Sequence, residues 1–184
     1  MKLLLAAALG GLGWLCAEYL IHRFLGHARK IRTEFGREHT KHHSVGDYFA
    51  PSWKKALMAA QVLLLMAAIS MPIAGVPVGA AFTIGFTATY LLYEVLHRRA
   101  HTHPPAGPYG RWLRKHHFYH HFHDPKTNHG VSWAMGDWIF RTNVVAARIQ
   151  VPEKLAMRWL LDPTTGEVFE AFRADYELVR RKAA

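Results

Sequence analysis

The sequence predicts an all-α integral membrane protein with about three transmembrane helices and a helical cap on one face of the membrane. Three observations lead to this fold class. The chain contains three long apolar runs, all of its Lys and Arg residues lie outside those runs, and many of its histidines lie near the ends of the runs. These observations rest on different residues, so their agreement strengthens the prediction.

The apolar runs have the length of membrane spans. They are Leu3–Ile21, which contains Glu18; Ala56–Pro72, which is uncharged; and Val78–Leu96, which contains Glu94. The first and third runs have 19 residues each, and such a helix is about 29 Å long, close to the thickness of a bilayer core. The middle run is shorter, so we expect its helix to extend to Trp53 on one side and to Val76 on the other.

The first run resembles a signal peptide at its start, because Lys2 precedes an apolar stretch. A signal peptide would be followed by a small-x-small cleavage site. Instead, the apolar residues pass directly into His22. We therefore expect a helix that is retained in the mature protein.

The distribution of charge predicts the orientation. The formal net charge is +10 with neutral histidines, and 22 of the 23 Lys and Arg residues lie in Arg23–Lys55 or after His97. With three spans these two segments lie on the same side, which the positive-inside bias makes cytoplasmic. A basic face beside anionic lipid explains the charge without a nucleic-acid partner. We expect a multi-pass protein of a bacterial inner membrane, with this face and the C-terminus in the cytoplasm.

Histidines carry the chemical signal. The chain has 14 histidines, and the pattern His-x-x-His-His occurs twice, beginning at His39 and at His117. Residues i, i+3 and i+4 share one face of a helix, so we expect each triplet to direct three imidazoles to one point. Neutral imidazoles crowded together need a shared cation, and four or five nitrogens suffice for one transition metal.

Two pairs join the triplets and suggest a second metal. His22 and His27 are five residues apart, and His97 and His101 are four apart. On an ideal helix the first two would be about 140° apart, and Gly26 allows the backbone to turn between them, so we expect the first helix to end or distort there. Ten histidines then form the predicted dimetal site: His22, His27, His39, His42, His43, His97, His101, His117, His120 and His121.

The predicted topology brings these histidines to one membrane face. The first helix ends at the pair His22–His27, and the first triplet lies in the connection to the second helix. The third helix returns and ends at the pair His97–His101, and the second triplet follows in a polar segment. Because the spans follow from hydropathy alone, this gathering supports the metal site independently.

Two carboxylates lie inside the predicted spans, where a charge is costly. Glu18 precedes His22 by four residues, and Glu94 precedes His97 by three. Each carboxylate could orient a ligand imidazole through its second ring nitrogen. Alternatively, each could simply reach the membrane interface.

The remaining histidines have simpler interpretations. His116 could replace His117 as a ligand, although the repeated triplet favours His117. His103 is expected in a loop, and His123 and His129 could support the site, although surface positions are more common. Four aromatic residues could line a path for a lipid or anchor the protein at the membrane interface: Phe49, Trp53, Tyr90 and Tyr93.

The cytosolic part is predicted to be helical. Gly110–His123 is predicted as the helix that carries the second triplet. Two further helices are predicted at Pro152–Leu160 and Glu167–Arg181, separated by the turn Asp162–Gly166. Apolar residues at helical spacing would give the last helix one buried face, which we expect to pack on the rest of the protein.

The histidine motifs resemble those of the fatty acid hydroxylase/sterol desaturase superfamily, over about residues 14–142. The four histidine boxes of that superfamily match here as His22-x4-His27, His39-x2-His42-His43, His97-x3-His101 and His117-x2-His120-His121. Three stretches around them are closest to the fatty acid 2-hydroxylases: Glu18–His27, Tyr93–His97 and Lys115–His121. Asn128–Ser132 and Gly136–Phe140 look like the closing segment of the family, and Asp137 within it is a candidate to support a ligand.

The resemblance implies a membrane-bound oxygenase that hydroxylates a lipid acyl chain at two metal ions, iron when active, with O2 as co-substrate. Zinc could replace iron in purified material, because zinc also fits nitrogen-rich sites. Some relatives carry a haem-binding domain for electron transfer, for which the sequence shows no counterpart. We therefore expect a separate electron donor, a ferredoxin or a cytochrome with its reductase. The donor could dock on the basic face, although lipid headgroups explain the same charges.

Two other functions stay open. Carotenoid and sterol hydroxylases or desaturases belong to the same superfamily, so the lipid is not defined by these motifs. From another class, a membrane metal transporter or metal-binding protein would also be rich in histidine, but transport requires ligands near the middle of the membrane. We divide the chain into a hydroxylase-like catalytic domain, residues 1–150, and a helical C-terminal tail, residues 151–184. The oligomeric state does not follow from the sequence.

Overall fold

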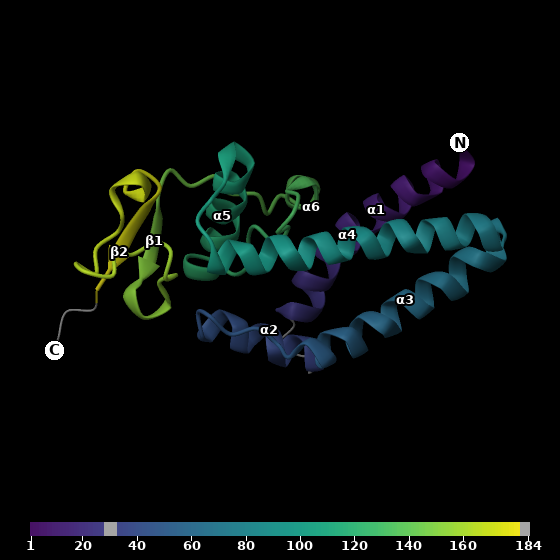
Figure 1. Ribbon diagram of the computed structural model, residues 1–184, viewed down its shortest axis with the longest axis horizontal. Coiled ribbons are helices and arrows are strands. Elements are labelled where there is room, and N and C mark those ends of the chain that lie inside the picture. The colour runs from purple at the N-terminus through teal and green to yellow at the C-terminus, as the bar shows by residue number, and fades with distance from the viewer. Residues whose placement is uncertain (28–32, 181–184) are drawn as a thin grey trace.

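The computed structural model describes residues 1–27 and 33–180, with three long helices at one end and smaller elements at the other (Figure 1). The long helices are α1 (Lys2–Ile21), α3 (Ser52–Ala74) and α4 (Val76–Thr102), and α1 continues as a π-helical turn, η1 (His22–Gly26). All three are long and apolar enough to cross a membrane. The predicted helical membrane fold with three spans is therefore confirmed.

Helices α3 and α4 form a hairpin whose turn is one residue long. Gly75 joins them with φ = 81°, a left-handed conformation that favours glycine. Pro77 lies in the first turn of α4, where its missing N–H costs nothing. Every residue of α3, all of which the structure describes, is at least partly exposed. Its apolar side chains therefore face outward, as expected of a helix surrounded by lipid.

Helix α1 packs along α4 through backbone contacts. A Cβ added at Gly10 would lie 2.0 Å from the carbonyl oxygen of Phe82, and one added at Gly85 would lie 1.9 Å from the carbonyl oxygen of Ala7. Helices in a bilayer associate mainly through close packing, because lipid tails are as apolar as the side chains. Glycines on both helices therefore allow the close approach that places the end of α1 beside the end of α4.

The cap is built at the end of the bundle opposite the Gly75 turn (Figure 1). Its α2 begins after Thr33, whose hydroxyl accepts a hydrogen bond from the Gly36 N–H at 2.9 Å. Its α5 agrees with the helix predicted at Gly110–His123. The elements of the cap are α2 (Glu34–Ser44), α5 (Gly107–Phe122), α6 (Met135–Ile139), β1 (Ile149–Pro152), η2 (Glu153–Leu155), η3 (Glu170–Phe172) and β2 (Tyr176–Val179).

The two helices predicted near the C-terminus are wrong. Pro152–Leu160 begins in β1 and continues as the 3-10 turn η2, and Glu167–Arg181 contains η3 and β2; Arg181 itself lies outside the described residues. The strands pair in parallel. The physical reason for a strand is that burial alternates from one residue to the next, because Ile149 and Val151 are buried on either side of an exposed residue. The predicted turn at Asp162–Gly166 is present, between two residues that form an antiparallel bridge.

The strand pair packs against the ends of α4 and α5. Ile149, Val151 and Tyr176 belong to the same buried cluster as Ala100 of α4 and Phe118 of α5. This cluster holds the C-terminal segment on the part of the protein that carries the histidines. The division of the chain at residue 150 stays a prediction, and that residue lies within β1.

We predict that Gly85→Val destabilises the protein because the added isopropyl group, whose Cβ alone would lie 1.9 Å from the Ala7 carbonyl oxygen, would force α1 away from α4. Overpacking of this kind costs about 1–3 kcal/mol. The melting temperature of the detergent-solubilised protein measures the effect. Ile84→Val is the matched control, since Ile84 is the neighbouring residue and is 66% exposed. Equal melting temperatures for the two variants would contradict the proposed packing.

Candidate metal centre

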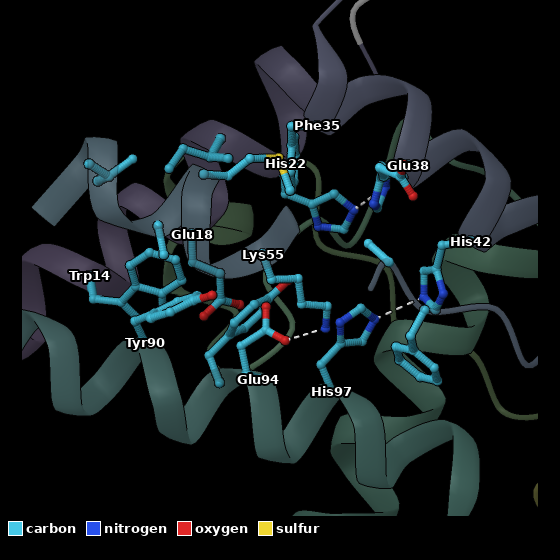
Figure 2. Close-up of a pocket in the computed structure, with 18 of the residues that line it drawn as sticks. Trp14, Glu18, His22, Phe35, Glu38, His42, Lys55, Tyr90, Glu94 and His97 are labelled. Carbon is cyan, nitrogen blue, oxygen red and sulfur yellow. Dashed lines mark hydrogen bonds and ion pairs between the residues drawn. The ribbon is translucent and has the colours of Figure 1, made fainter. Parts of the chain in front are cut away.

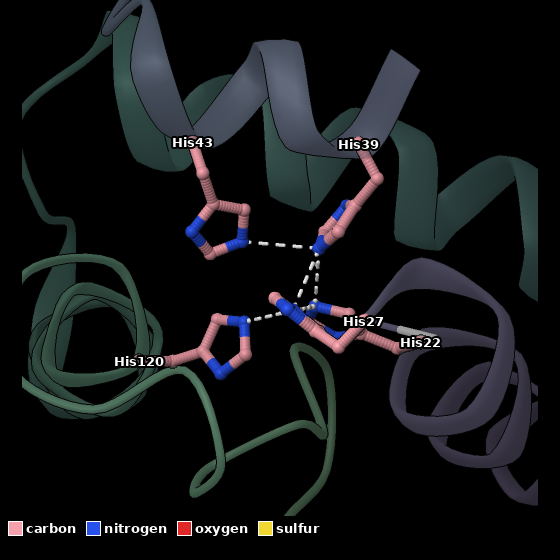
Figure 3. A group of neighbouring side chains, drawn as sticks. All are labelled: His22, His27, His39, His43 and His120. Atoms are coloured by element: carbon pink, nitrogen blue, oxygen red, sulfur yellow. Dashed lines mark hydrogen bonds between the residues drawn. The ribbon is translucent and has the colours of Figure 1, made fainter. Parts of the chain in front are cut away.

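The structure brings all ten predicted histidines together in two groups of five at the cap end of the bundle. Within each group one ring nitrogen from every histidine lies within 4.8 Å of all the others. Group one contains His22, His27, His39, His43 and His120 (Figure 3). Group two contains His42, His97, His101, His117 and His121.

The expectation that each triplet directs three imidazoles to one point is wrong. Of the triplet on α2, His39 and His43 join group one, whereas His42 joins group two. On a helix, residues i and i+4 differ by about 40°, but residue i+3 lies about 60° away from residue i in the opposite direction. The pair i and i+4 therefore faces one group while residue i+3 faces the other.

The second triplet is divided in the opposite sense. On α5, His117 and His121 join group two, and His120 joins group one. Each of the helices α2 and α5 therefore contributes to both groups. The His-x-x-His-His pattern is the sequence of a helix that lies between two sites, and not of a helix that serves one site.

The predicted distortion between His22 and His27 is present as the π-helical turn η1. The wider turn brings the Nε2 atoms of these two residues to 3.4 Å from each other. Gly26 is needed here for a reason that the sequence did not reveal. A Cβ at this position would lie 3.0 Å from the ring of His39 and 3.3 Å from the ring of Phe35, so a larger residue would displace a group-one histidine.

For three of the ten histidines, a backbone carbonyl determines which ring nitrogen faces the centre of the group. The Nδ1 atom of His22 lies 2.5 Å from the His129 carbonyl oxygen, and that of His42 lies 2.7 Å from the Tyr48 carbonyl oxygen. The Nδ1 atom of His120 is likewise 2.7 Å from the carbonyl oxygen of Thr127. A carbonyl only accepts hydrogen bonds, so Nδ1 carries the proton and Nε2 presents a lone pair.

The Nε2 atoms approach one another closely inside both groups. In group one, His39 Nε2 lies 2.9 Å from His22 Nε2 and 2.9 Å from His27 Nε2. In group two, the Nε2 atoms of His42 and His97 are 3.0 Å apart. Lone pairs that face each other at these distances repel, and a shared cation removes the repulsion. The donor set therefore fits one transition metal in each group.

Burial keeps these imidazoles uncharged. Desolvation lowers the pKa of His42 to about 4, and desolvation together with the neighbouring histidines lowers the pKa of His43 to about 2. For the same reasons the pKa values of His117 and His121 lie well below their ordinary value. At neutral pH both groups therefore offer neutral nitrogen donors, which suit iron, zinc or copper better than calcium or magnesium.

Neither predicted carboxylate orients a histidine. Glu18 is buried, and its Oε1 accepts hydrogen bonds from the backbone N–H groups of Val131 at 2.6 Å and Ser132 at 2.8 Å. Glu94 forms an ion pair with Lys55. The spacing does place each carboxylate one helical turn from a ligand candidate. For His22, however, the loop that contains His129 supplies the acceptor instead.

Asp137 holds the loop that contains His129 in place. It accepts hydrogen bonds from the N–H of His129 at 2.8 Å, the N–H of Gly130 at 2.8 Å and the hydroxyl of Thr142 at 2.7 Å. Its other neighbour is His116, whose Nε2 lies 3.2 Å away, so His116 stands outside both groups. Burial alone would raise the pKa of Asp137, but these bonds outweigh burial and lower the pKa.

For His129 the sequence left two alternatives, support of the site or a surface position, and favoured the surface; the structure agrees with the first alternative. The side chain of His129 is 2% exposed, and its carbonyl oxygen holds His22. The preceding residue, Asn128, has φ = 52°, a conformation that asparagine tolerates better than most residues. By contrast, His123 accepts a hydrogen bond from the Gln150 N–H, and His103 is exposed in a loop.

An apolar cavity leads to both groups of histidines (Figure 2). His22 and His39 of group one and His42 and His97 of group two belong to its wall. Of the four predicted path residues, Phe49, Tyr90 and Tyr93 line the cavity, but Trp53 does not, since it is 65% exposed. Other lining residues, which the sequence interpretation did not include, are Trp14, Phe35, Met58, Val62, Leu63 and Phe86.

Fold and site together define a helical membrane protein of the histidine-box type, with places for two metal ions beside an apolar cavity. Residues 7–142 match the family model described as fatty acid hydroxylase. The chain belongs to the fatty acid hydroxylase family, and the resemblance seen in the motifs is confirmed.

The relatives include fatty acid 2-hydroxylases of animals and plants. The fatty acid 2-hydroxylase of Homo sapiens is 32% identical over 145 residues, which are 73% of this chain and 38% of that protein. The dihydroceramide fatty acyl 2-hydroxylase FAH2 of Arabidopsis thaliana is 28% identical over 146 residues, which are 75% of this chain and 60% of that protein. The chain thus spans less than two thirds of either relative.

A solved structure supports the fold. The structure of full-length scs7p, in which only the hydroxylase domain is visible, superimposes with a TM-score of 0.63 at 21% identity, covering 78% of this chain and 56% of that one. At this identity the likeness concerns the arrangement of the helices.

We predict that the metal-free protein loses stability when the pH falls from about 6.5 to about 4. In the unfolded chain histidines take up protons near their ordinary pKa of 6.5, whereas folded His42 resists protonation until about pH 4. The unfolded state therefore binds more protons in this interval, and His42 alone contributes a loss of about 3 kcal/mol. Melting temperatures of the chelator-treated protein at pH 7.5 and pH 4 measure this loss. A melting temperature that does not change would show that the imidazoles are not buried as described.

We predict that Asp137→Asn weakens metal binding, because the NH2 that replaces one carboxylate oxygen donates hydrogen bonds, so the side chain can no longer accept from both the His129 N–H and the Gly130 N–H of the loop behind His22. Such supporting residues typically change metal affinity about 10- to 100-fold. Metal content after dialysis against a weak chelator measures the effect. Asp175→Asn is the matched control, since Asp175 is also a buried carboxylate, paired with Arg111 and far from the loop in sequence. Equal loss of metal in both variants would contradict the role of Asp137.

Proposed function

We propose that the protein is a membrane-bound hydroxylase that uses O2 and two metal ions, iron when active, to oxidise the acyl chain of a lipid. The single observation that carries this proposal is the junction of the cavity with the histidines. An apolar cavity between helices long enough to cross a membrane ends at imidazoles from both groups. A lipid chain in the cavity would therefore end beside both metals.

The relatives support hydroxylation near the head of the acyl chain. Two of them are named as 2-hydroxylases, of a fatty acid and of a dihydroceramide fatty acyl group. We transfer this activity to the present chain as part of the proposal, with position 2 as the site of reaction. Carotenoid and sterol oxidation are the alternatives within the superfamily.

Group one and group two would each hold one metal through five neutral Nε2 or Nδ1 atoms. Bound iron supplies the redox chemistry that reduces O2 and breaks an unactivated C–H bond, which no side-chain acid or base can do. Zinc would fit the same nitrogens without that chemistry, so purified protein that contains zinc would be inactive.

The protein's own residues perform the remaining tasks. The carbonyl groups of Tyr48, Thr127 and His129 keep protons on the outer ring nitrogens, so that the inner nitrogens stay available. The aromatic wall, which includes Phe49 and Phe86, excludes water from the place where the chain would lie. Excluding water protects a reactive centre from side reactions. The shape of the cavity orients the acyl chain.

The electron donor and the membrane also belong to the proposed function. Electrons would come from a separate donor, a ferredoxin or a cytochrome, that reaches the cap. The protein would lie in a bacterial inner membrane with the cap and the C-terminus in the cytoplasm, as the distribution of basic residues indicates. The described residues of the cap present many Arg and Lys side chains that could meet an acidic partner or anionic lipid.

We predict that His42→Ala and His120→Ala each abolish lipid oxidation, since each removes a nitrogen from a different group. Loss should exceed the roughly 100-fold effect that removal of an outer supporting residue can have. Lipids of cells that express each variant, extracted and analysed for a mass gain of one oxygen, measure the activity. The experiment also identifies the lipid class.

The control for this comparison is His103→Ala, because His103 is exposed and belongs to neither group. It should retain the activity of the parent protein. Activity retained in both His42→Ala and His120→Ala would refute the ligand assignment. A loss of two hydrogens instead of a gain of oxygen would indicate desaturation. No lipid product with a matched electron donor, together with metal accumulation in the cells, would favour the metal-handling alternative.

A further inference from the structure

The apolar cavity contains a small polar region that the metal sites do not use. Three charged side chains of the membrane helices line the cavity: Glu18 of α1, Lys55 of α3 and Glu94 of α4. In the view of Figure 2 the pair Lys55–Glu94 lies between Glu18 and Tyr90 on one side and His97 on the other. A role for these residues in substrate binding rests on the proposed function.

The ion pair neutralises the ammonium group of Lys55. Lys55 Nζ donates a hydrogen bond to Glu94 Oε2, and both side chains are three-quarters buried or more. The ammonium also lies 5.4 Å from the centre of the Phe49 ring, which faces the same cavity. A partly buried ammonium beside apolar walls requires a counter-charge, and Glu94 supplies it.

Glu18 leaves one polar atom unused. Its Oε1 accepts two backbone hydrogen bonds, whereas its Oε2 is buried and has no hydrogen-bond partner among the described residues. One helical turn earlier, the indole Nε1 of Trp14 is also buried without a described partner. Buried polar atoms are nearly always paired, so two such atoms on the wall of one cavity indicate a missing polar ligand.

The polar region lies close to the histidines along the chain. Glu18 precedes His22 by one helical turn, and Glu94 precedes His97 by nearly one turn. A turn rises about 5.4 Å. A polar head bound at these residues would therefore place the first carbons of an acyl chain, and not its middle or its end, beside the two groups of histidines.

We propose that Lys55, Glu94 and Glu18 form the binding site for the polar head of the acyl substrate, and that Glu94 makes this site select an uncharged head over a free carboxylate. The selection follows from the balance of charge. Lys55 is the one cation among these three residues, and Glu94 already occupies it. A free carboxylate would have to displace Glu94, whereas an amide can hydrogen-bond to the free atoms of Glu18 and Trp14 without breaking the pair.

Binding of two ligands to Glu94→Gln tests the proposal. Palmitic acid and palmitoylethanolamide compete with a fluorescent acyl amide for the full-length protein in detergent, which retains its metals and is kept free of O2. The parent protein should prefer the amide. Glu94→Gln keeps the size of the side chain and frees Lys55, so palmitic acid should gain about tenfold relative to the amide. Attraction of the carboxylate to the metals is common to both proteins and cancels in this ratio.

A second variant and a control complete the design. Lys55→Met removes the cation, so its preference for the amide should increase beyond that of the parent. Glu34→Gln is the control, because Glu34 pairs with the adjacent Lys54 and does not line the cavity. Its ratio should equal that of the parent. A variant that does not fold is recognised by its size-exclusion elution profile. The ligand preference of the other variant then tests the proposal.

Two outcomes would overturn the inference. Equal loss of both ligands in Glu94→Gln and Lys55→Met would mean that the ion pair only joins α3 to α4. An unchanged ratio in both variants would mean that the head group binds elsewhere. Because no turnover is needed, the result is independent of the oxidation assay. A protein that binds acyl amides selectively but oxidises none would refute the proposed function and leave the binding site intact.

Discussion

The structure depends on holding ten uncharged imidazoles with their lone pairs directed inward. A hydrogen-bond acceptor behind the ring is the simplest way to keep the proton on the outer nitrogen. Carbonyl groups inside a helix are already occupied by the helix, so free carbonyls come from loops. Tyr48, Thr127 and His129, which supply the observed acceptors, all lie between helices. The irregular segments after α2 and α5 are therefore as necessary to the site as the helices that carry the histidines.

The same constraint couples the two groups. Helices α2 and α5 each contribute to group one and to group two, so neither helix can move without changing both. The π-helical turn η1 contributes His22 to group one and is followed directly by His27, and α4 adds His97 and His101 to group two. Close packing of α1 on α4 through Gly10 and Gly85 fixes the distance between these contributions. The position of the metals relative to one another thus depends on contacts made deep within the spans.

The sequence predicted those features that depend on local patterns. Hydropathy located the spans, and the spacing of histidines selected the same ten that the structure groups together. It did not predict how the triplets divide, because that depends on what lies on either side of each helix. It did not predict the acceptor for His22 either, since His129 is 107 residues away. The strands near the C-terminus were mistaken for helices because Val168, Phe172 and Tyr176 also fit a helical period, and their burial against Phe118 is a tertiary effect.

The polar residues within the spans lie where the head group of a membrane lipid could reach them. Glu18, Lys55 and Glu94 come from three different helices, yet all lie near the cap end of the spans. A charge at that depth costs less than one at the centre of the bilayer. In a membrane that the three helices cross, the boundary between head and chain of a lipid would also lie toward this end of the spans. A lipid could therefore enter the cavity with its head at the polar residues and its chain along the apolar wall, without moving its head into the hydrocarbon. The reactive centre would then meet the carbons nearest the head, which is the position that the names of the relatives give.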